Sequence, residues 1–235
     1  MEPEKTGKAY ETVIDYIKKQ ILSGSLQKGR KLPPERELAE RLGVSRNSVR
    51  EALRTLEILG AVTSTQGAGN YIACDFQRSL FESMSLMFLL QEIDYRQLSE
   101  LRRALERQAV SLAAGRVTAR QLGEMESAVA ALAVGRDEAR NVVLDKRLHT
   151  LIAEASGNRL ICLILQALSD VMDLFIEDLR RQILSDTAGG SRLQKIHEAM
   201  VDCLRHGDRE GACRAVDAHF ALVDQQLMAA EIDKN

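Results

Sequence analysis

Apolar residues recur at helical spacing over the first 60 positions, with turn-forming residues between the runs. The run at about residues 10–22 places its apolar side chains on one helix face, and these are Val13, Ile14, Ile17 and Ile21. After a Pro-Pro pair, the segment ERELAERLG begins with acidic residues, as helices often do, and stops at Gly43. Ser45 can then cap a third helix, SRNSVREALRTLEILG, which ends at Gly60. The pattern predicts three helices, with a short turn between the second and the third.

Two strand-like segments follow the third helix. AVTST and NYIA flank the turn-forming segment QGAG, which predicts a short β-hairpin. Three helices, a short turn between the last two, and a hairpin are the outline of a winged helix-turn-helix. We therefore expect residues 1–73 to form a winged helix-turn-helix DNA-binding domain.

The pattern changes after residue 73. Apolar positions keep the helical period through the rest of the chain, and no strand pattern occurs. No proline follows Pro34, which favours long helices. Glycines separate the helices expected at about residues 79–91, 96–115, 118–133, 138–155, 159–185, 191–206 and 208–231. The expected fold class is mainly α, with a linker at 74–78 and an all-α bundle of six or seven helices at 79–231.

Composition narrows the class of protein further. Hydrophobic residues make up 45% of the 235 positions, which is enough for a packed core and too many for a disordered chain. The four cysteines include no CxxC pair, so we expect neither a zinc ribbon nor a disulfide framework. The first residues lack an apolar signal core, and no apolar run approaches 18 residues. We therefore expect no membrane span and a location in the reducing cytoplasm.

Charge is unevenly distributed along the chain. The net charge is −2, yet residues 1–73 hold 12 Lys and Arg against 9 Asp and Glu, whereas the rest holds 20 against 25. A basic first part on an acidic body points toward nucleic-acid binding by the first domain. This asymmetry gains weight only together with the side chains of the third predicted helix.

The start of that helix carries the side chains that would contact DNA. Arginine can donate two hydrogen bonds to guanine, asparagine can pair with adenine, and serine hydroxyls suit phosphate oxygens. The candidates are Arg36 in the second helix, Ser45, Arg46, Asn47, Ser48 and Arg50 at the third, and Gln66 and Gly67 at the hairpin tip. Any single arginine is better explained by a solvated, charged helix face. The ordered set instead favours a recognition helix with a wing.

The first domain resembles the DNA-binding domain of the GntR family of bacterial transcription regulators, through KLPPERELAERLGVSRNSVREALRTLEILGAV and QGAGNYI. The similarity covers about residues 10–73 and includes the LP-x-ERELA, GVSR and VREAL-x-x-LE-x-x-G blocks in order. The resemblance implies a homodimer in which each recognition helix and wing binds one half of a near-palindromic double-stranded operator. It also implies DNA contacts from the wing tip and from Arg36, Arg46 and Arg50.

Three histidines and one acid occupy inward positions on three predicted helices. Asp145 and His149 are four residues apart on one apolar stripe, and His197 and His219 lie on the apolar stripes of two later helices. His206 differs because it ends a helix, where an exposed position is expected. One inward histidine is usually a core residue with a satisfied hydrogen bond. Three of them with an acid at i,i+4 are a suitable ligand set for a divalent metal ion.

Residues 79–231 resemble the FCD ligand-binding domain that accompanies one GntR subfamily. The D-x-x-x-H helix, the SGN segment, a later H-x-x-M and a final histidine match that domain's metal-site pattern. The resemblance implies a divalent metal ion, zinc before nickel or manganese, at Asp145, His149, His197 and His219. It also implies open coordination positions that face a small organic acid.

The same resemblance singles out Arg102 as the residue that holds the carboxylate of this acid. A guanidinium can grip a carboxylate with two parallel hydrogen bonds. Arg102 flanks an apolar stripe made of Leu98, Leu101, Leu105 and Ala109. The alternative is a helix-surface ion pair between Arg102 and Glu106 at i,i+4. Asn158, which follows the helix of Asp145 and His149, is a further candidate for the same pocket.

The sequence therefore predicts a bacterial transcription regulator, usually a repressor in such a family, and not an enzyme. A small carboxylate effector at the metal-containing domain would control operator binding by shifting the population of conformations. Two alternatives stay open. One is a metal-dependent hydrolase fused to a DNA-binding head, although neither HExxH nor GxSxG occurs. The other is a regulator whose metal ion only stabilises the helical bundle.

Overall fold

The computed structural model describes residues 4–135, 137–185 and 187–232. The chain divides into two compact units, Met1–Glu82 and Ser83–Asn235. The division falls inside a helix, α4 (Gln77–Leu90), and residues 73–76 before it form no helix or strand. The expected linker at 74–78 thus overlaps the first turn of α4. The boundaries 1–73, 74–78 and 79–231 stay a prediction.

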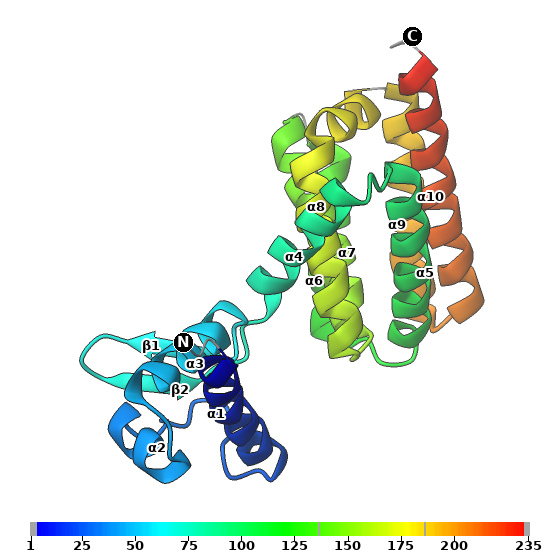
Figure 1. The fold of residues 1–235 in the computed structure, drawn as a ribbon. Helices are drawn as coiled ribbons and strands as arrows, with labels where there is room; N and C mark the ends of the chain where they lie inside the picture. Colours follow the sequence, from blue (N-terminus) through cyan, green and yellow to red (C-terminus); the bar gives the residue numbers. More distant parts are fainter. Residues whose placement is uncertain (1–3, 136, 186, 233–235) are drawn as a thin grey trace. The chain divides into compact units, whose positions relative to one another are not determined.

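The first unit contains the predicted winged helix-turn-helix (Figure 1). Its elements are α1 (Glu4–Leu22), α2 (Glu35–Leu42), α3 (Arg46–Ile58), β1 (Val62–Thr65) and β2 (Gly69–Ile72). The two strands pair antiparallel, with Val62 opposite Ile72 and Thr65 opposite Gly69. Inward apolar side chains of all three helices and the hairpin form one core, including Val13, Ile17, Leu38, Val49, Leu53, Leu56, Val62 and Ile72.

Side-chain caps explain where several helices begin. Ser45 Oγ accepts a hydrogen bond of 3.0 Å from the backbone N–H of Ser48, which confirms the predicted cap of α3. Asp94 and Gln97 form a reciprocal capping box at the start of α5, and so do Thr118 and Gln121 at the start of α6. These local signals depend only on neighbouring residues, so they can act before the bundle is assembled.

Gly60 ends the α3 segment in a conformation that other residues rarely adopt. Its φ is 77°, and a Cβ there would collide with the backbone carbonyl of Asp75. Gly60→Ala is therefore expected to lower the free energy of unfolding of the first unit by about 2 kcal/mol or more, from backbone strain and overlap together. Urea unfolding of the full chain followed by circular dichroism measures this loss.

Gly24→Ala is the matched control for this prediction. Gly24 has a similar φ of 76°, but nothing lies within 4 Å of a Cβ built there. This control therefore introduces the backbone strain without the overlap, and its loss should be clearly smaller. Equal losses in the two variants would show that the close approach of Asp75 has no energetic effect.

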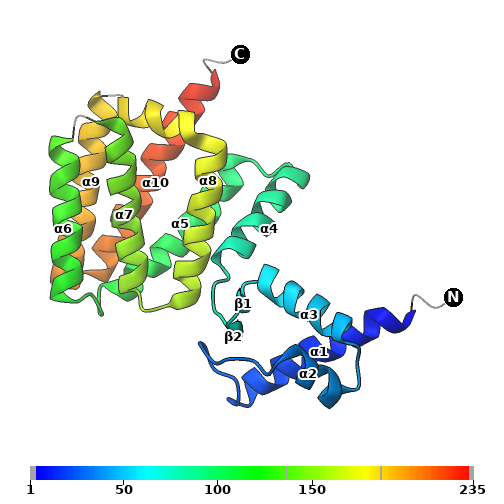
Figure 2. The same ribbon diagram turned by 90° about the vertical axis from the view of Figure 1, so that its left-hand side faces the viewer.

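The second unit is an all-α bundle (Figure 2). After α4, its helices are α5 (Tyr95–Ala113), α6 (Ala119–Val134), α7 (Glu138–Ala155), α8 (Arg159–Ser185), α9 (Thr187–His206) and α10 (Arg209–Ile232). Helix α7 packs against α5, α6 and α8, and α10 packs against α5 and α9. None of the helices in the described part of the chain combines the length and apolarity that crossing a bilayer requires.

The helices predicted from the sequence are confirmed, and one of them begins earlier than predicted. Helix α9 starts at Thr187 rather than at residue 191, so it runs through Gly189 and Gly190. The glycine pair was expected to break the helix. Glycine lowers helix stability by about 1 kcal/mol relative to alanine without excluding the helical conformation, so the helix can include the glycine pair.

Candidate functional site

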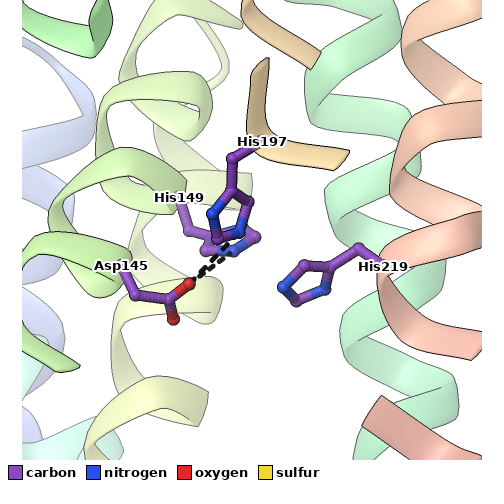
Figure 3. Close-up of side chains that lie close together, drawn as sticks. All are labelled: Asp145, His149, His197 and His219. Atoms are coloured by element: carbon purple, nitrogen blue, oxygen red, sulfur yellow. Dashed lines mark ion pairs between the residues drawn. The ribbon is translucent and has the colours of Figure 1, made fainter. Parts of the chain in front are cut away.

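Three helices of the bundle bring one acid and three histidines together. Helix α7 supplies Asp145 and His149, α9 supplies His197 and α10 supplies His219. All four residues are buried, and their candidate ligand atoms lie within 4.8 Å of one another. Figure 3 shows the four side chains pointing toward one shared space between the helices. These are the four residues that the sequence predicts as metal ligands.

Three imidazole nitrogens at this centre have no hydrogen-bond partner among the described residues: His149 Nε2, His197 Nε2 and His219 Nδ1. Asp145 Oδ1 lies 3.3 Å from His197 Nε2 and 3.7 Å from His149 Nε2 (Figure 3). Buried polar atoms are nearly always satisfied, and leaving them unsatisfied costs free energy. Three nitrogens and one carboxylate oxygen that converge in this way fit the ligand set of a metal ion. The protein therefore has a buried group that could bind a metal ion.

Burial sets the protonation of these rings. It lowers the pKa of His197 to about 4, although the nearby Asp145 carboxylate opposes the shift. Burial also lowers the pKa of His219 well below its usual value, and the neighbouring His149 and His197 add to the effect. His149 differs: burial alone would lower its pKa, but the Glu106 carboxylate, with a smaller contribution from Asp145, raises it. His197 and His219 are thus neutral near pH 7, which is the form in which imidazole binds metals.

Glu106 of α5 is the residue at this centre that the sequence did not identify. Its Oε2 accepts a hydrogen bond of 2.7 Å from His149 Nδ1, and its Oε1 lies 2.5 Å from Arg102 Nη2. The Arg102 and Glu106 side chains are only 7% and 6% exposed, so the ion pair, which the sequence offered as an alternative on the helix surface, is in fact buried. Guanidinium and imidazole neighbours lower the pKa of Glu106 despite its burial.

The spacing of Glu106 on α5 could have identified it, because it lies four residues after Arg102 and three before Ala109. Leu98, Arg102, Glu106 and Ala109 form one buried line along the helix. Leu101, which the sequence assigned to the inward stripe, is 44% exposed. The buried face of α5 therefore differs from the face with the most apolar residues. It can include Arg102 and Glu106 because these two charged side chains pair with each other.

A cavity of about 250 Å³ borders this centre. Arg102, Glu106 and His149 line it, together with Lys146, Thr150 and Gln166 among others. Its volume is below the 300–1,000 Å³ that is usual for drug-sized ligands, so it suits a small molecule. Arg102 Nη1 donates to Met172 Sδ at 2.8 Å, and Arg102 Nε has no partner among the described residues. Lys146 adds a second cation to the wall and pairs with Asp173.

A second cavity, of about 570 Å³, also borders this centre and is lined by different residues. Asp145 and His197 line it, with Asn141, Gln194 and Lys195 from α7 and α9. His149 lines the first cavity and is not among the residues that line the second. His149 therefore faces one cavity, and Asp145 and His197 face the other, whereas His219 is not among the residues that line either cavity.

Asn158 and His206 lie away from these cavities. Asn158 Oδ1 accepts hydrogen bonds from the backbone N–H groups of Leu160 and Ile161, at 3.1 and 3.3 Å, and so caps α8. Asn158 is not among the residues that line either cavity. His206 is exposed at the end of α9, as expected, with Nδ1 2.9 Å from the backbone oxygen of Asp202.

The predicted DNA-contacting residues of α2 and α3 fall into two groups. Arg36, Arg46, Asn47 and Arg50 are exposed, whereas Ser48 is only 3% exposed. The Ser48 hydroxyl lies 2.8 Å from Ser45 Oγ, so both serines take part in the cap of α3. This burial disfavours a direct DNA contact by the Ser48 side chain.

Two of the exposed arginines form ion pairs with acids. Arg50 Nε donates to Glu35 Oε2 at 2.7 Å, and Arg36 Nε lies 3.6 Å from Glu40 Oε1. Both pairs are exposed and therefore weak, so either arginine can turn to a phosphate or a base. At the hairpin tip, Gln66 and Gly67 are exposed, and Gly67 has a φ of 76°. Glycine supplies this turn conformation without strain.

Comparison with known proteins gives two family matches. Residues 9–72 match the model of bacterial regulatory proteins of the gntR family, and residues 97–222 match the model of the FCD domain. The second match alone covers more than half of the chain. Together the two matches reach both compact units.

Several known proteins are similar to this chain over most of its length. A protein of Escherichia coli (strain K12), provisionally named as the L-lactate dehydrogenase operon regulatory protein, is 30% identical over 95% of this chain and 88% of its own. The HTH-type transcriptional regulator LutR of Bacillus subtilis (strain 168) is 30% identical over 88% of this chain and 95% of its own. A solved structure titled Streptococcus agalactiae GntR has a TM-score of 0.65 at 25% identity and covers 92% of this chain and 99% of its own.

Proposed function

Because this chain belongs to the GntR family of bacterial transcription regulators and carries an FCD domain, we propose that a small organic acid controls its binding to an operator. The chain is a DNA-binding transcription regulator and not an enzyme. In the proposed mechanism the acid binds beside a metal ion in the second unit. The acid binds the DNA-binding and the non-binding conformations of the protein with different affinities, and thereby shifts their populations.

The observation that carries this proposal is the convergence of three unsatisfied imidazole nitrogens on one buried carboxylate. Asp145, His149, His197 and His219 would hold a divalent metal ion. Zinc is the first choice because it accepts imidazole and carboxylate ligands and can expand from four ligands to five, with nickel and manganese as the next candidates. When bound, the ion supplies a positive centre that attracts a carboxylate oxygen.

The smaller cavity supports an anionic effector. Arg102 and Lys146 line its wall beside three acids, Glu106, Glu154 and Asp170, so the guanidinium and the ammonium are the groups there that can bind an anion. Thr150, Gln166 and Ser169 offer further polar groups. A guanidinium suits a carboxylate, and hydroxyl and amide groups suit hydroxyl or oxo substituents. The candidate effectors are 2-hydroxy acids, 2-oxo acids, sugar acids and dicarboxylates. Since one relative is named for an L-lactate dehydrogenase operon, 2-hydroxy acids come first. Asn158 is left out of this site because its side-chain oxygen caps α8.

In the proposed complex with DNA, a homodimer places its two recognition helices on a near-palindromic operator. Arg46, Asn47 and Arg50 of α3 would read bases, and Arg36 would contact the backbone or a groove edge. The start of α3 at Ser45 and the wing tip at Gln66 and Gly67 would approach phosphates and the minor groove. Repression relieved by the effector is the simplest outcome of this arrangement.

A metal ion that only stabilises the bundle is the competing proposal. Thermal-shift measurements on metal-loaded and chelator-treated protein against a panel of carboxylates separate the two. A sensor should show a concentration-dependent rise in melting temperature with one class of acid, only when metal is present. A rise on metal addition with no response to any acid would support the structural ion instead.

Arg102→Lys tests the effector site without removing the positive charge beside Glu106. Lysine lacks the planar fork of arginine, so affinity for the acid is expected to fall by about 10-fold or more. Metal content and operator affinity without effector should stay near those of the wild type. Isothermal calorimetry measures the loss. The matched control is Arg103→Lys on the same helix, whose arginine pairs with Asp217 outside the cavity. If Arg102→Lys binds the acid as tightly as the wild type does, Arg102 serves only as the partner of Glu106.

A further inference from the structure

Glu106 uses each of its two carboxylate oxygens for a different donor. Oε2 accepts from His149 Nδ1 at 2.7 Å, and Oε1 accepts from Arg102 Nη2 at 2.5 Å. The residue is 4% exposed, so bulk solvent screens these contacts only weakly. One buried anion therefore lies between a candidate metal ligand and the arginine proposed to hold the effector.

The contact with His149 determines which nitrogen of that ring faces the metal centre. A carboxylate can only accept, so His149 Nδ1 must carry the proton that it donates. Nε2 is then the ring nitrogen that faces Asp145 Oδ1, 3.7 Å away, and it has no hydrogen-bond partner among the described residues. Glu106 thereby keeps His149 in the orientation in which Nε2 can bind a metal ion.

The contact with Arg102 holds the guanidinium against the cavity wall. Arg102 Nη1 donates to Met172 Sδ at 2.8 Å, and the Arg102 Cζ atom lies 5.7 Å from the centre of the Phe220 ring. With Nη2 on Glu106, the planar group has contacts on several sides. Its position in the cavity is therefore set before any ligand arrives.

We infer that Glu106 is a positioning residue that links the two halves of the sensor site, by orienting His149 for the metal ion and Arg102 for the effector. This inference rests on the proposed function, because it assumes that a metal ion and an acid bind there. An effector carboxylate that binds Arg102 draws on the same guanidinium that Glu106 holds. Metal affinity and effector affinity are then coupled through one side chain, and the coupling is reciprocal.

Glu106→Gln in the full-length chain tests the role of Glu106. Glutamine has nearly the same shape but only one acceptor oxygen, and the guanidinium is the stronger donor for it. The amide nitrogen then faces His149 and donates to Nδ1, which places the His149 proton on Nε2 and blocks metal binding by that atom. Zinc affinity in a chelator competition should fall by about 10- to 100-fold. Glu126→Gln is the matched control, because Glu126 pairs with Arg205 between α6 and α9 and should leave zinc affinity unchanged.

The double variant Arg102→Met with Glu106→Gln separates positioning from a general loss of packing. Without the guanidinium, the glutamine oxygen is free to accept from His149, so zinc affinity should recover toward the wild-type value. Effector binding should stay lost, because Arg102 is absent. If Glu106 only filled space or stabilised the fold, the second substitution would leave zinc affinity as low as in the single variant, or lower it further.

Nitrogen NMR of the histidine rings in the zinc-loaded wild type provides a readout that does not depend on the variants folding. His149 should carry its proton on Nδ1 and bind zinc through Nε2. A proton on Nε2, or equal zinc affinity in Glu106→Gln and wild type, overturns this inference alone. A wild-type chain that takes up no zinc, nickel or manganese overturns the proposed metal site and this inference together.

Discussion

His197→Ala is expected to purify with little or no bound metal, whereas the wild type should carry about one divalent ion per chain. His197 is 1% exposed, and its Nε2 lies 3.3 Å from Asp145 Oδ1 among the other candidate ligand atoms. Removing it deletes one of the four candidate ligands, so the remaining two imidazoles and one carboxylate should hold the ion less tightly and lose it to a competing chelator during purification. Because the effector is proposed to need the metal ion, the variant should also lose its response to the acid. Elemental analysis measures the metal, and calorimetry measures the response.

Removing the metal ion from the wild type with a chelator should lower the melting temperature of the second unit. The three imidazole nitrogens would be left without a partner in a buried site. An ion present at 100 times its dissociation constant contributes about 2.7 kcal/mol, which corresponds to roughly 5–10 °C for a chain of this size. His206→Ala is the internal control, because His206 is exposed and contacts Asp202, one turn earlier in its own helix. Equal metal content in wild type and His197→Ala would reduce the four residues to polar core groups.

Arg46→Ala and Arg50→Ala are each expected to remove most specific operator binding while leaving the fold intact. Both side chains are exposed on α3, where a recognition helix meets base edges. Losing a bidentate contact to a base costs about 1–3 kcal/mol, and a homodimer loses one such contact in each half-site, so affinity should fall by roughly 30-fold or more at fixed salt. Binding to a scrambled duplex should change much less, because that binding depends on phosphate contacts in general.

The measurement is fluorescence anisotropy with an operator selected from random duplexes by the wild-type protein. Arg120→Ala is the matched control, because it removes one exposed arginine that pairs with Glu124 on α6 in the second unit. Arg46→Ala, Arg50→Ala and the control should all keep the wild-type circular dichroism spectrum. If Arg46→Ala and Arg50→Ala bind the selected operator as tightly as Arg120→Ala does, α3 is not the recognition helix.

Much of the architecture could be predicted because its signals are local. The cap at Ser45 and the hairpin around QGAG depend on a few neighbouring residues, and the structure confirms both. The family inferred from the sequence is confirmed by the two family matches and by the relatives. The grouping of Asp145, His149, His197 and His219 also followed from helix periodicity and the FCD pattern, and the structure brings these residues together. Metal binding itself stays a prediction.

What the sequence by itself determined was which side chains share a helix face, because 3.6 residues per turn relates neighbours at i+3 and i+4 whatever surrounds the helix. Only the tertiary structure decided which faces meet. The i,i+4 spacing of Arg102 and Glu106 allowed a surface pair as the alternative to the effector role of Arg102. Packing of α5 against α7 instead buries both side chains and brings Glu106 to His149, 43 positions further along the chain. Likewise, Ser48 is buried at the start of α3, although the sequence predicted it as a DNA-contacting residue together with its neighbours. Such contacts depend on how helices rotate when their side chains interlock, which no spacing within one helix encodes.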